Sequence, residues 1–291
     1  MREYTYVGYD AKIANENEDA PILKITKSSL MNHLWCPKQY DFNYLQGLPQ
    51  DTSEAMMAGS IMHNSYEDWY NEFDVQKAEG MSPSEIQDYA LSLFPIDDYT
   101  DFYHTMAAWE TNRFIESRGE GKLDQFMPVI NEVKLDAEVT IETHDAHLPL
   151  RHNHTIHLQG IIDRMFEEDQ GYVPVEFKTG RWGKHKATGM RKEMAFYKWL
   201  FDATPDEDKV ALGLDPEKKI THWAWFFPKN NVFVYEKVKN VSVTGMMKTV
   251  VNLLRSYEND DWPTNYRERS CVNCSYYNIC DAATNDGWFN I

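Results

Sequence analysis

Cysteine is scarce in this chain: 4 residues among 291, at positions 36, 271, 274 and 280. So few thiols exclude a disulfide-rich secreted scaffold and point to a reducing compartment. Long apolar runs are also missing, and no stretch reaches the roughly 18 residues that a membrane-spanning helix needs. The N-terminal segment has no apolar centre of the signal-peptide type. We therefore expect an intracellular, cytoplasmic protein with no membrane partner and with a polar, partly disordered lead-in over residues 1–25.

Positive charge is in short supply as well, since 29 Lys and Arg against 46 Asp and Glu give a net charge of -17. A chain this acidic is a poor general binder of polyanions, so any contact with nucleic acid has to use a local basic strip. Such a strip lies between residues 181 and 192, where Trp182 is accompanied by five cations: Arg181, Lys184, Lys186, Arg191 and Lys192. Taken alone, this strip is equally well explained as a solvated loop.

The spacing of apolar residues divides the chain into a helical part and a mixed part. Helical periodicity predicts helices over 27–46, with Ser28 or Ser29 as cap and a break at Cys36–Pro37, and over 53–74, about 83–94 and about 98–117. From residue 127 the pattern alternates, which predicts three consecutive strands, followed by a helix over 189–202, a hairpin over 219–237 and a final helix capped by Ser242.

This order of elements predicts a mixed α/β domain around one central sheet. We expect a helical block over residues 26–126, a core over 127–260 and a small clasp over 261–291 that joins the two ends of the chain.

The hairpin over residues 158–180 carries the strongest chemical signal. Asp163 ends an apolar run, and buried acids are rare unless they are paired or ligated. Glu176 and Lys178 are two positions apart on the following strand, so they share one face, and the hairpin brings Asp163 beside them. Two carboxylates and an ammonium group on rigid strands suit a hard cation with a positioned base. A single Glu-x-Lys pair is weak evidence, because exposed strand faces often carry one.

The cysteines have an uneven spacing. Three of them form a Cys-x2-Cys-x5-Cys pattern in the tail, and Cys36 lies 235 positions before Cys271. Four thiolates suit a structural zinc ion, although zinc sites more often combine two local pairs. They suit a [4Fe–4S] cluster equally well. The spacing alone leaves both alternatives open.

These motifs, in this order, resemble the PD-(D/E)XK nuclease superfamily, and within it the RecB-like branch with CRISPR-associated RecB-like exonucleases and AddB-type nuclease domains. Residues 160–163 and 175–179 resemble its motifs II and III, and residues 59–63, ending at His63, resemble its upstream histidine motif. Residues 190–197 lie where the branch has a Gln-containing helix motif that ends in tyrosine: Tyr197 matches, but Glu193 stands at the Gln position. The four cysteines resemble the branch's split iron–sulfur clasp.

The resemblance implies a restriction-endonuclease-like mixed sheet with an N-terminal helical block and a C-terminal iron–sulfur clasp. It implies that Mg²⁺ or Mn²⁺ is held by His63, Asp163, Glu176 and the carbonyl of Phe177, with Lys178 and Tyr197 as further catalytic residues. Some relatives carry an acid near the metals at the place of Glu132. The resemblance also favours a [4Fe–4S] cluster on Cys36, Cys271, Cys274 and Cys280, with structural zinc as the alternative.

Together these features predict a metal-dependent DNA exonuclease that hydrolyses phosphodiester bonds of single-stranded DNA or DNA ends in recombination, replication or repair. The basic strip would contact phosphates, and Trp182 would stack on an unpaired base. One rival is a non-catalytic DNA-binding or scaffold subunit that keeps the nuclease fold, which the acidic charge and Glu193 favour. A zinc-clasped structural protein is a second rival. Besides DNA, a homo-oligomer or a recombination protein as partner stays open.

Overall fold

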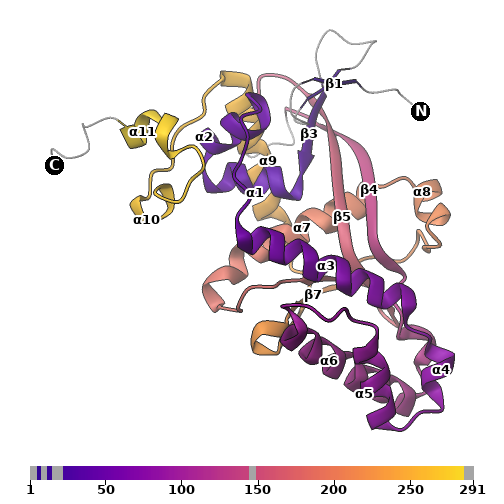
Figure 1. Ribbon diagram of the computed structural model, residues 1–291. Helices are drawn as coiled ribbons and strands as arrows, with labels where there is room; N and C mark the ends of the chain where they lie inside the picture. Colours follow the sequence, from indigo (N-terminus) through magenta and orange to yellow (C-terminus); the bar gives the residue numbers. More distant parts are fainter. Residues whose placement is uncertain (1–4, 8–11, 15–21, 144–148, 285–291) are drawn as a thin grey trace.

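The computed structural model describes residues 5–7, 12–14, 22–143 and 149–284. Its centre is an eight-stranded mixed sheet with the order β1-β2-β3-β5-β6-β7-β8, in which β4 also pairs with β5 (Figure 1). The strands are β1 (Thr5–Val7), β2 (Lys12–Ala14), β3 (Ile22–Thr26), β4 (Ile130–Ile141), β5 (His154–Glu168), β6 (Gly171–Phe177), β7 (His222–Phe227) and β8 (Val232–Lys237). This confirms the predicted mixed α/β fold around one sheet.

Helices lie on both sides of the long strands β4 and β5 in the chain. The α-helices are α1 (Lys27–Trp35), α2 (Pro37–Tyr40), α3 (Glu54–Glu72), α4 (Val75–Glu79), α5 (Pro83–Ser92), α6 (Thr100–Glu120), α7 (Ala187–Ala203), α8 (Asp206–Ala211), α9 (Asn240–Asn259), α10 (Glu268–Cys271) and α11 (Asp281–Thr284). The break at Cys36–Pro37 is present, and a π-helical turn over Asp41–Leu45 follows α2. Both predicted helix caps are wrong. Thr26 caps α1 in place of Ser28 or Ser29, and α9 begins at Asn240, so Ser242 lies inside that helix.

Strands β1 and β2 and most of β3 lie inside the segment for which we expected only a polar lead-in. Residues 22–25 belong to β3, which pairs in parallel with the first half of β5 as far as Thr26 and Gln159. Ile22, Leu23 and Ile25 are buried. A run of five residues after a polar stretch is too short for its periodicity to stand out, and its pairing with β2 and β5 and its burial in the core stabilise it. Residues 1–4, 8–11 and 15–21 of the predicted lead-in lie outside the described residues.

The pairing pattern leaves a gap along one edge of β5. Strand β4 pairs with β5 along almost all its length, from His154 to Met165, so β3 and β6 must share the other edge. β3 runs parallel to β5, whereas β6 runs antiparallel to it and ends its pairing at Arg164. The carboxyl ends of β3 and β6 therefore point toward each other across residues 160–163 of β5. Side chains just beyond the two strand ends can meet there.

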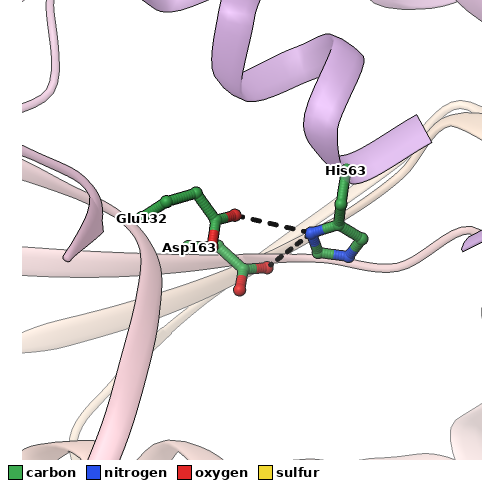
Figure 2. A group of neighbouring side chains, drawn as sticks. All are labelled: His63, Glu132 and Asp163. Atoms are coloured by element: carbon green, nitrogen blue, oxygen red, sulfur yellow. Dashed lines mark ion pairs between the residues drawn. The ribbon is translucent and has the colours of Figure 1, made fainter. Parts of the chain in front are cut away.

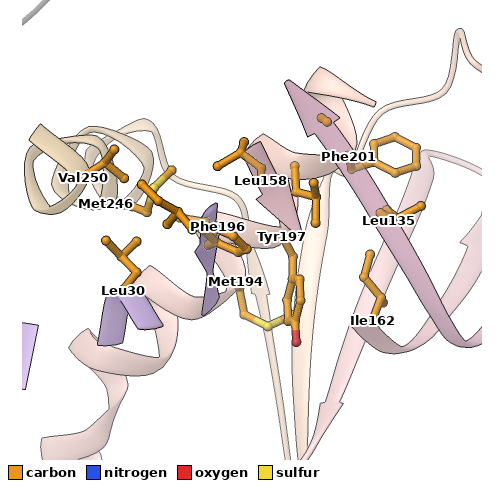
Figure 3. Packing of buried hydrophobic residues seen from close by; sticks show 14 of the residues in the cluster. Leu30, Leu135, Leu158, Ile162, Met194, Phe196, Tyr197, Phe201, Met246 and Val250 are labelled. Atoms are coloured by element: carbon orange, nitrogen blue, oxygen red, sulfur yellow. The ribbon is translucent and has the colours of Figure 1, made fainter. Parts of the chain in front are cut away.

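Two large apolar cores pack against the sheet. One joins the sheet to α1, α7 and α9 and contains Leu30, Leu158, Phe196 and Val250 (Figure 3). The other fills the helical block α3–α6 and also takes in Phe177 of β6 and Phe226 of β7. The helical block is therefore packed directly on the sheet, and the division of the chain at residue 126 stays a prediction. Across the described ranges, no helix combines the length and the apolar character that crossing a membrane requires.

Candidate metal and nucleic-acid site

Three possible metal ligands meet where α3 crosses the strands β4 and β5. The Nδ1 atom of His63 lies 3.6 Å from Oε1 of Glu132 and 3.7 Å from Oδ2 of Asp163 (Figure 2). One ligand atom from each residue lies within 4.8 Å of the other two. Two carboxylate oxygens and one imidazole nitrogen suit Mg²⁺ or Mn²⁺. Sequence reasoning expected His63, Asp163 and Glu176 as ligands and named Glu132 as an acid that could lie near the metals. The group of three contains His63, Asp163 and Glu132, and Glu176 lies outside it.

Asp163 is the buried centre of this group. Its side chain is held by the backbone N–H of Phe177, which donates to Oδ2 over 2.8 Å. Burial raises the pKa of Asp163, and the neighbouring Glu176 raises it further, while His63 and Lys27 oppose the shift. Ionising Asp163 therefore costs more free energy in the metal-free folded protein than in water. A bound cation would remove this cost.

Glu132 is strained and incompletely satisfied. Its φ of 52° falls in the left-handed region, which is unusual for a strand residue other than glycine and typically costs about 1–3 kcal/mol. Its Oε1 atom is buried without a hydrogen-bond donor, and so is Oε2 of Glu176. Buried carboxylate oxygens without partners are costly. The donor set therefore fits a divalent cation that would satisfy them.

Two lysines donate hydrogen bonds to Oε1 of Glu176, the oxygen that is not left without a partner. Oε1 accepts hydrogen bonds from Lys27 and from Lys178, the latter over 2.9 Å. Burial alone would raise the pKa of Glu176, but the two ammonium groups outweigh it and lower that pKa. Lys178 also donates to Oε2 of Glu193 over 2.8 Å. Sequence reasoning missed Lys27, whose one local signal is a lysine at the first position of a helix, directly after a strand.

Helix α7 brings Tyr197 and Glu193 to the site because β5 has a glycine at the crossing. A Cβ at Gly160 would lie 3.3 Å from Cε1 of Tyr197 and 3.0 Å from Cδ2 of Leu200, so a larger residue would push α7 away. Lys27 Nζ lies 4.9 Å from the centre of the Tyr197 ring. Burial raises the pKa of Tyr197, and Glu176 and Asp163 add to the effect. The phenol is thus part of the same electrostatic cluster.

A known protein family matches most of the chain, including all the residues of this site. The family description "PD-(D/E)XK nuclease superfamily" matches residues 24–281. The chain belongs to the PD-(D/E)XK nuclease superfamily. Among solved structures that match, one titled "Crystal structure of SSO0001" has 13% sequence identity and a TM-score of 0.33, covering 83% of this chain and 100% of that chain. The comparison with curated proteins found no match. Membership of the superfamily indicates a nuclease that acts on DNA, and the group of His63, Glu132 and Asp163 is a possible site for a divalent metal ion.

The basic strip after Lys178 contains two kinds of cation in this superfamily member: some are hydrogen-bonded to other side chains of the protein, and others are exposed to solvent. Arg191 donates to both carboxylate oxygens of Glu236, over 2.7 and 2.6 Å, and Lys192 donates to Thr249 over 3.2 Å. Trp182 is half-buried, with its ring 5.4 Å from that of Phe227. The exposed basic side chains are Arg181, Lys184 and Lys186, although Lys186 also donates to the carbonyl of Arg181. The role of the strip in DNA binding and the role of the Phe177 carbonyl as a ligand stay predictions.

The tail of the chain docks on the segment around Cys36. Lys38 donates its N–H to the carbonyl of Pro263 over 3.3 Å, and Asn265 donates to the carbonyl of Trp35 over 2.8 Å. These contacts bring all four cysteines to one small pocket, whose lining includes Cys36, Cys271, Cys274 and Cys280. Burial raises the pKa of Cys274, and the three other thiols add to the effect. The tail therefore lies against the segment that carries Cys36, and its role as a clasp stays a prediction.

Proposed function

We propose that this protein is a Mg²⁺- or Mn²⁺-dependent exonuclease that hydrolyses phosphodiester bonds of single-stranded DNA or DNA ends. The observation that carries the proposal is the convergence of His63, Glu132 and Asp163 beside a Glu176–Lys178 pair, in a member of a nuclease superfamily. A non-catalytic scaffold has no need of buried carboxylate oxygens without partners. Such oxygens are costly in a resting structure and useful only when a cation binds.

The residues divide the work as follows. His63, Glu132 and Asp163 would hold the cation, which when bound supplies Lewis-acid stabilisation of the charge that develops on the phosphate. Glu176, which lies outside this group of three, would be a further ligand through its unpartnered Oε2. Lys178 is a hydrogen-bond donor here: burial lowers its pKa, but Glu176 and Glu193 outweigh burial and raise it overall. We assign Lys178 to orienting the attacking water and to stabilising negative charge on the phosphate. Tyr197 would keep water out of the carboxylate cluster from the side of α7.

The DNA strand would approach along the exposed part of the basic strip. Arg181, Lys184 and Lys186 follow directly on Lys178 in the chain, so they place positive charge beside the carboxylates. Phosphate contacts of this kind supply affinity without sequence readout. The partly exposed Trp182 would stack on an unpaired base, which favours single strands and ends over intact duplex.

For the clasp we propose a [4Fe–4S] cluster with a structural role. All four cysteines line one pocket, and four thiolates are the usual ligands of such a cluster. Structural zinc, which more often uses two local cysteine pairs, is the alternative. An anaerobic preparation should be brown and contain about four iron atoms per chain; a colourless protein with one zinc would contradict the proposal.

Digestion of end-labelled linear and circular single-stranded DNA tests the activity. We expect degradation of the linear strand with Mg²⁺ or Mn²⁺, no degradation with chelator, and resistance of the circle. Asp163→Ala and Lys178→Ala should abolish cleavage, whereas Lys198→Ala, in an ion pair with Asp202 on α7, should not. Cleavage by the Asp163 variant would refute the mechanism. Binding of DNA without cleavage by the wild-type protein would favour the scaffold alternative, and cleavage of the circle would indicate an endonuclease.

A further inference from the structure

Lys27 is held in an unusual position for a lysine. It is the first residue of α1, where the helix dipole disfavours a cation. The backbone there is fixed by a reciprocal cap, in which Ser29 N–H donates to Oγ1 of Thr26 over 3.0 Å and Thr26 N–H donates to Oγ of Ser29 over 2.9 Å. The preceding strand ends at the gap along β5, so the Lys27 side chain extends into the carboxylate cluster and donates to Glu176.

Glu193 is the second unusual residue of the cluster. Its carboxylate accepts a hydrogen bond from Lys178, a contact that a glutamine side chain could make through its amide oxygen without a net charge. Its side chain keeps only 19% of its exposure, so solvent screens this extra charge incompletely. The Glu193 carboxylate therefore makes the site more negative than the hydrogen bond requires.

The charges of the two residues cancel within the cluster. Four carboxylates, those of Glu132, Asp163, Glu176 and Glu193, face the two ammonium groups of Lys27 and Lys178, so the count is −4 plus +2, or −2 with His63 neutral. Without both Lys27 and Glu193 the count is −3 plus +1, which is again −2. That charge matches one divalent cation. Removing only one of the two would shift the balance to −3 or −1.

We propose that Lys27 and Glu193 are a compensating pair of positioning residues that sets the charge, and with it the cation affinity, of the metal site. Lys27 donates to Oε1 of Glu176 and leaves Oε2 of that carboxylate without a hydrogen-bond partner. This inference rests on the proposed metal-dependent function. It adds two residues that touch neither the cation nor the substrate: they act through Glu176 and Lys178.

The affinity for Mn²⁺, followed by electron paramagnetic resonance of the free ion without DNA, tests the pair. Lys27→Met should bind Mn²⁺ at least about tenfold more tightly and Glu193→Gln at least about tenfold more weakly, since one unit charge at 4–6 Å changes the proton affinity of a carboxylate by roughly ten- to a thousandfold. The double variant should return to the wild-type affinity. Lys27→Arg, which keeps the charge, and Lys198→Met, outside the cluster, should leave the affinity unchanged.

The outcomes separate this inference from the proposed function. If the wild-type protein binds Mn²⁺ but Lys27→Met binds it equally or more weakly, the compensating pair is refuted and the metal site stands. If the double variant fails to return to the wild-type affinity, the pair is also refuted. If wild-type and Asp163→Ala proteins bind Mn²⁺ equally, the proposed metal site itself is wrong. Should Lys27→Met fail to fold, the Mn²⁺ affinities of Glu193→Gln and Lys27→Arg still test the inference. The charge argument predicts weaker binding by Glu193→Gln and unchanged binding by Lys27→Arg.

Discussion

Replacing Asp163 by asparagine should stabilise the metal-free protein while destroying its metal site. The reason is that Asp163 is buried among carboxylates and its pKa is raised from 3.8 to about 6. Above pH 6 the folded protein has to carry this charge, whereas the unfolded chain ionises it freely. Asparagine has almost the same shape, has no charge, and can still accept the hydrogen bond from the N–H of Phe177 through its amide oxygen.

The expected gain follows from the two pKa values. Moving the pKa from 3.8 to about 6 corresponds to about 3 kcal/mol at 1.4 kcal/mol per tenfold change in proton affinity. Because the folded-state pKa is raised, this stability is fully present in the wild-type protein below pH 3.8 and is lost as the pH rises through 6. The variant should therefore exceed the wild-type protein in stability by up to about 3 kcal/mol at pH 8 and by about 1 kcal/mol at pH 4.5.

Urea unfolding in the presence of chelator measures the stability difference between the variant and the wild-type protein at pH 8 and at pH 4.5. Asp136→Asn on β4 is the matched control, because it should change the free energy of unfolding in the opposite direction. Burial raises the pKa of Asp136, but hydrogen bonds from His157 and Gln159 outweigh it and lower that pKa to about 2, so asparagine there should destabilise at pH 8. With Mn²⁺ added, the wild-type protein should gain stability and Asp163→Asn should not. An Asp163→Asn protein no more stable than wild type at pH 8 in chelator would refute the reasoning.

Other parts of the structure make equally direct predictions. Gly160→Val should force α7 away from β5, cost about 1–3 kcal/mol in thermal unfolding and reduce nuclease activity together with it; an active variant of unchanged stability would contradict the close packing. Burial lowers the pKa of His33 from 6.5 to about 4, so stability that is complete above pH 6.5 should fall by about 3 kcal/mol as the pH drops through 4, and His33→Leu should flatten this profile in urea titrations. Arg181→Ala combined with Lys184→Ala should weaken binding of single-stranded DNA and reduce its salt dependence, whereas Arg191→Ala, which removes a partner of Glu236, should do so much less; equal effects would place Arg191 on the DNA.

Features that depend on a few neighbouring residues could be predicted from the sequence alone. The shared face of Glu176 and Lys178 follows from the two-residue period of a strand, and the break of the first helix follows from Pro37. The order of helical and alternating segments was enough to predict a mixed sheet with a helical block. The ordered motifs also predicted the superfamily, because each combines residue types and spacings that are specific when taken together.

The neighbours of these residues across the chain were decided only by the tertiary structure. Lys27 meets Glu176 from 149 positions away, because β3 and β6 end toward each other on the same edge of β5. Glu132 joins His63 and Asp163 through a left-handed backbone that no strand pattern predicts. Local periodicity reports which face a side chain occupies, but not which strand pairs beside it or how far that strand extends. The sequence therefore determined the acids and the lysine of the hairpin, and the pairing of distant strands determined the ligands and charges around them.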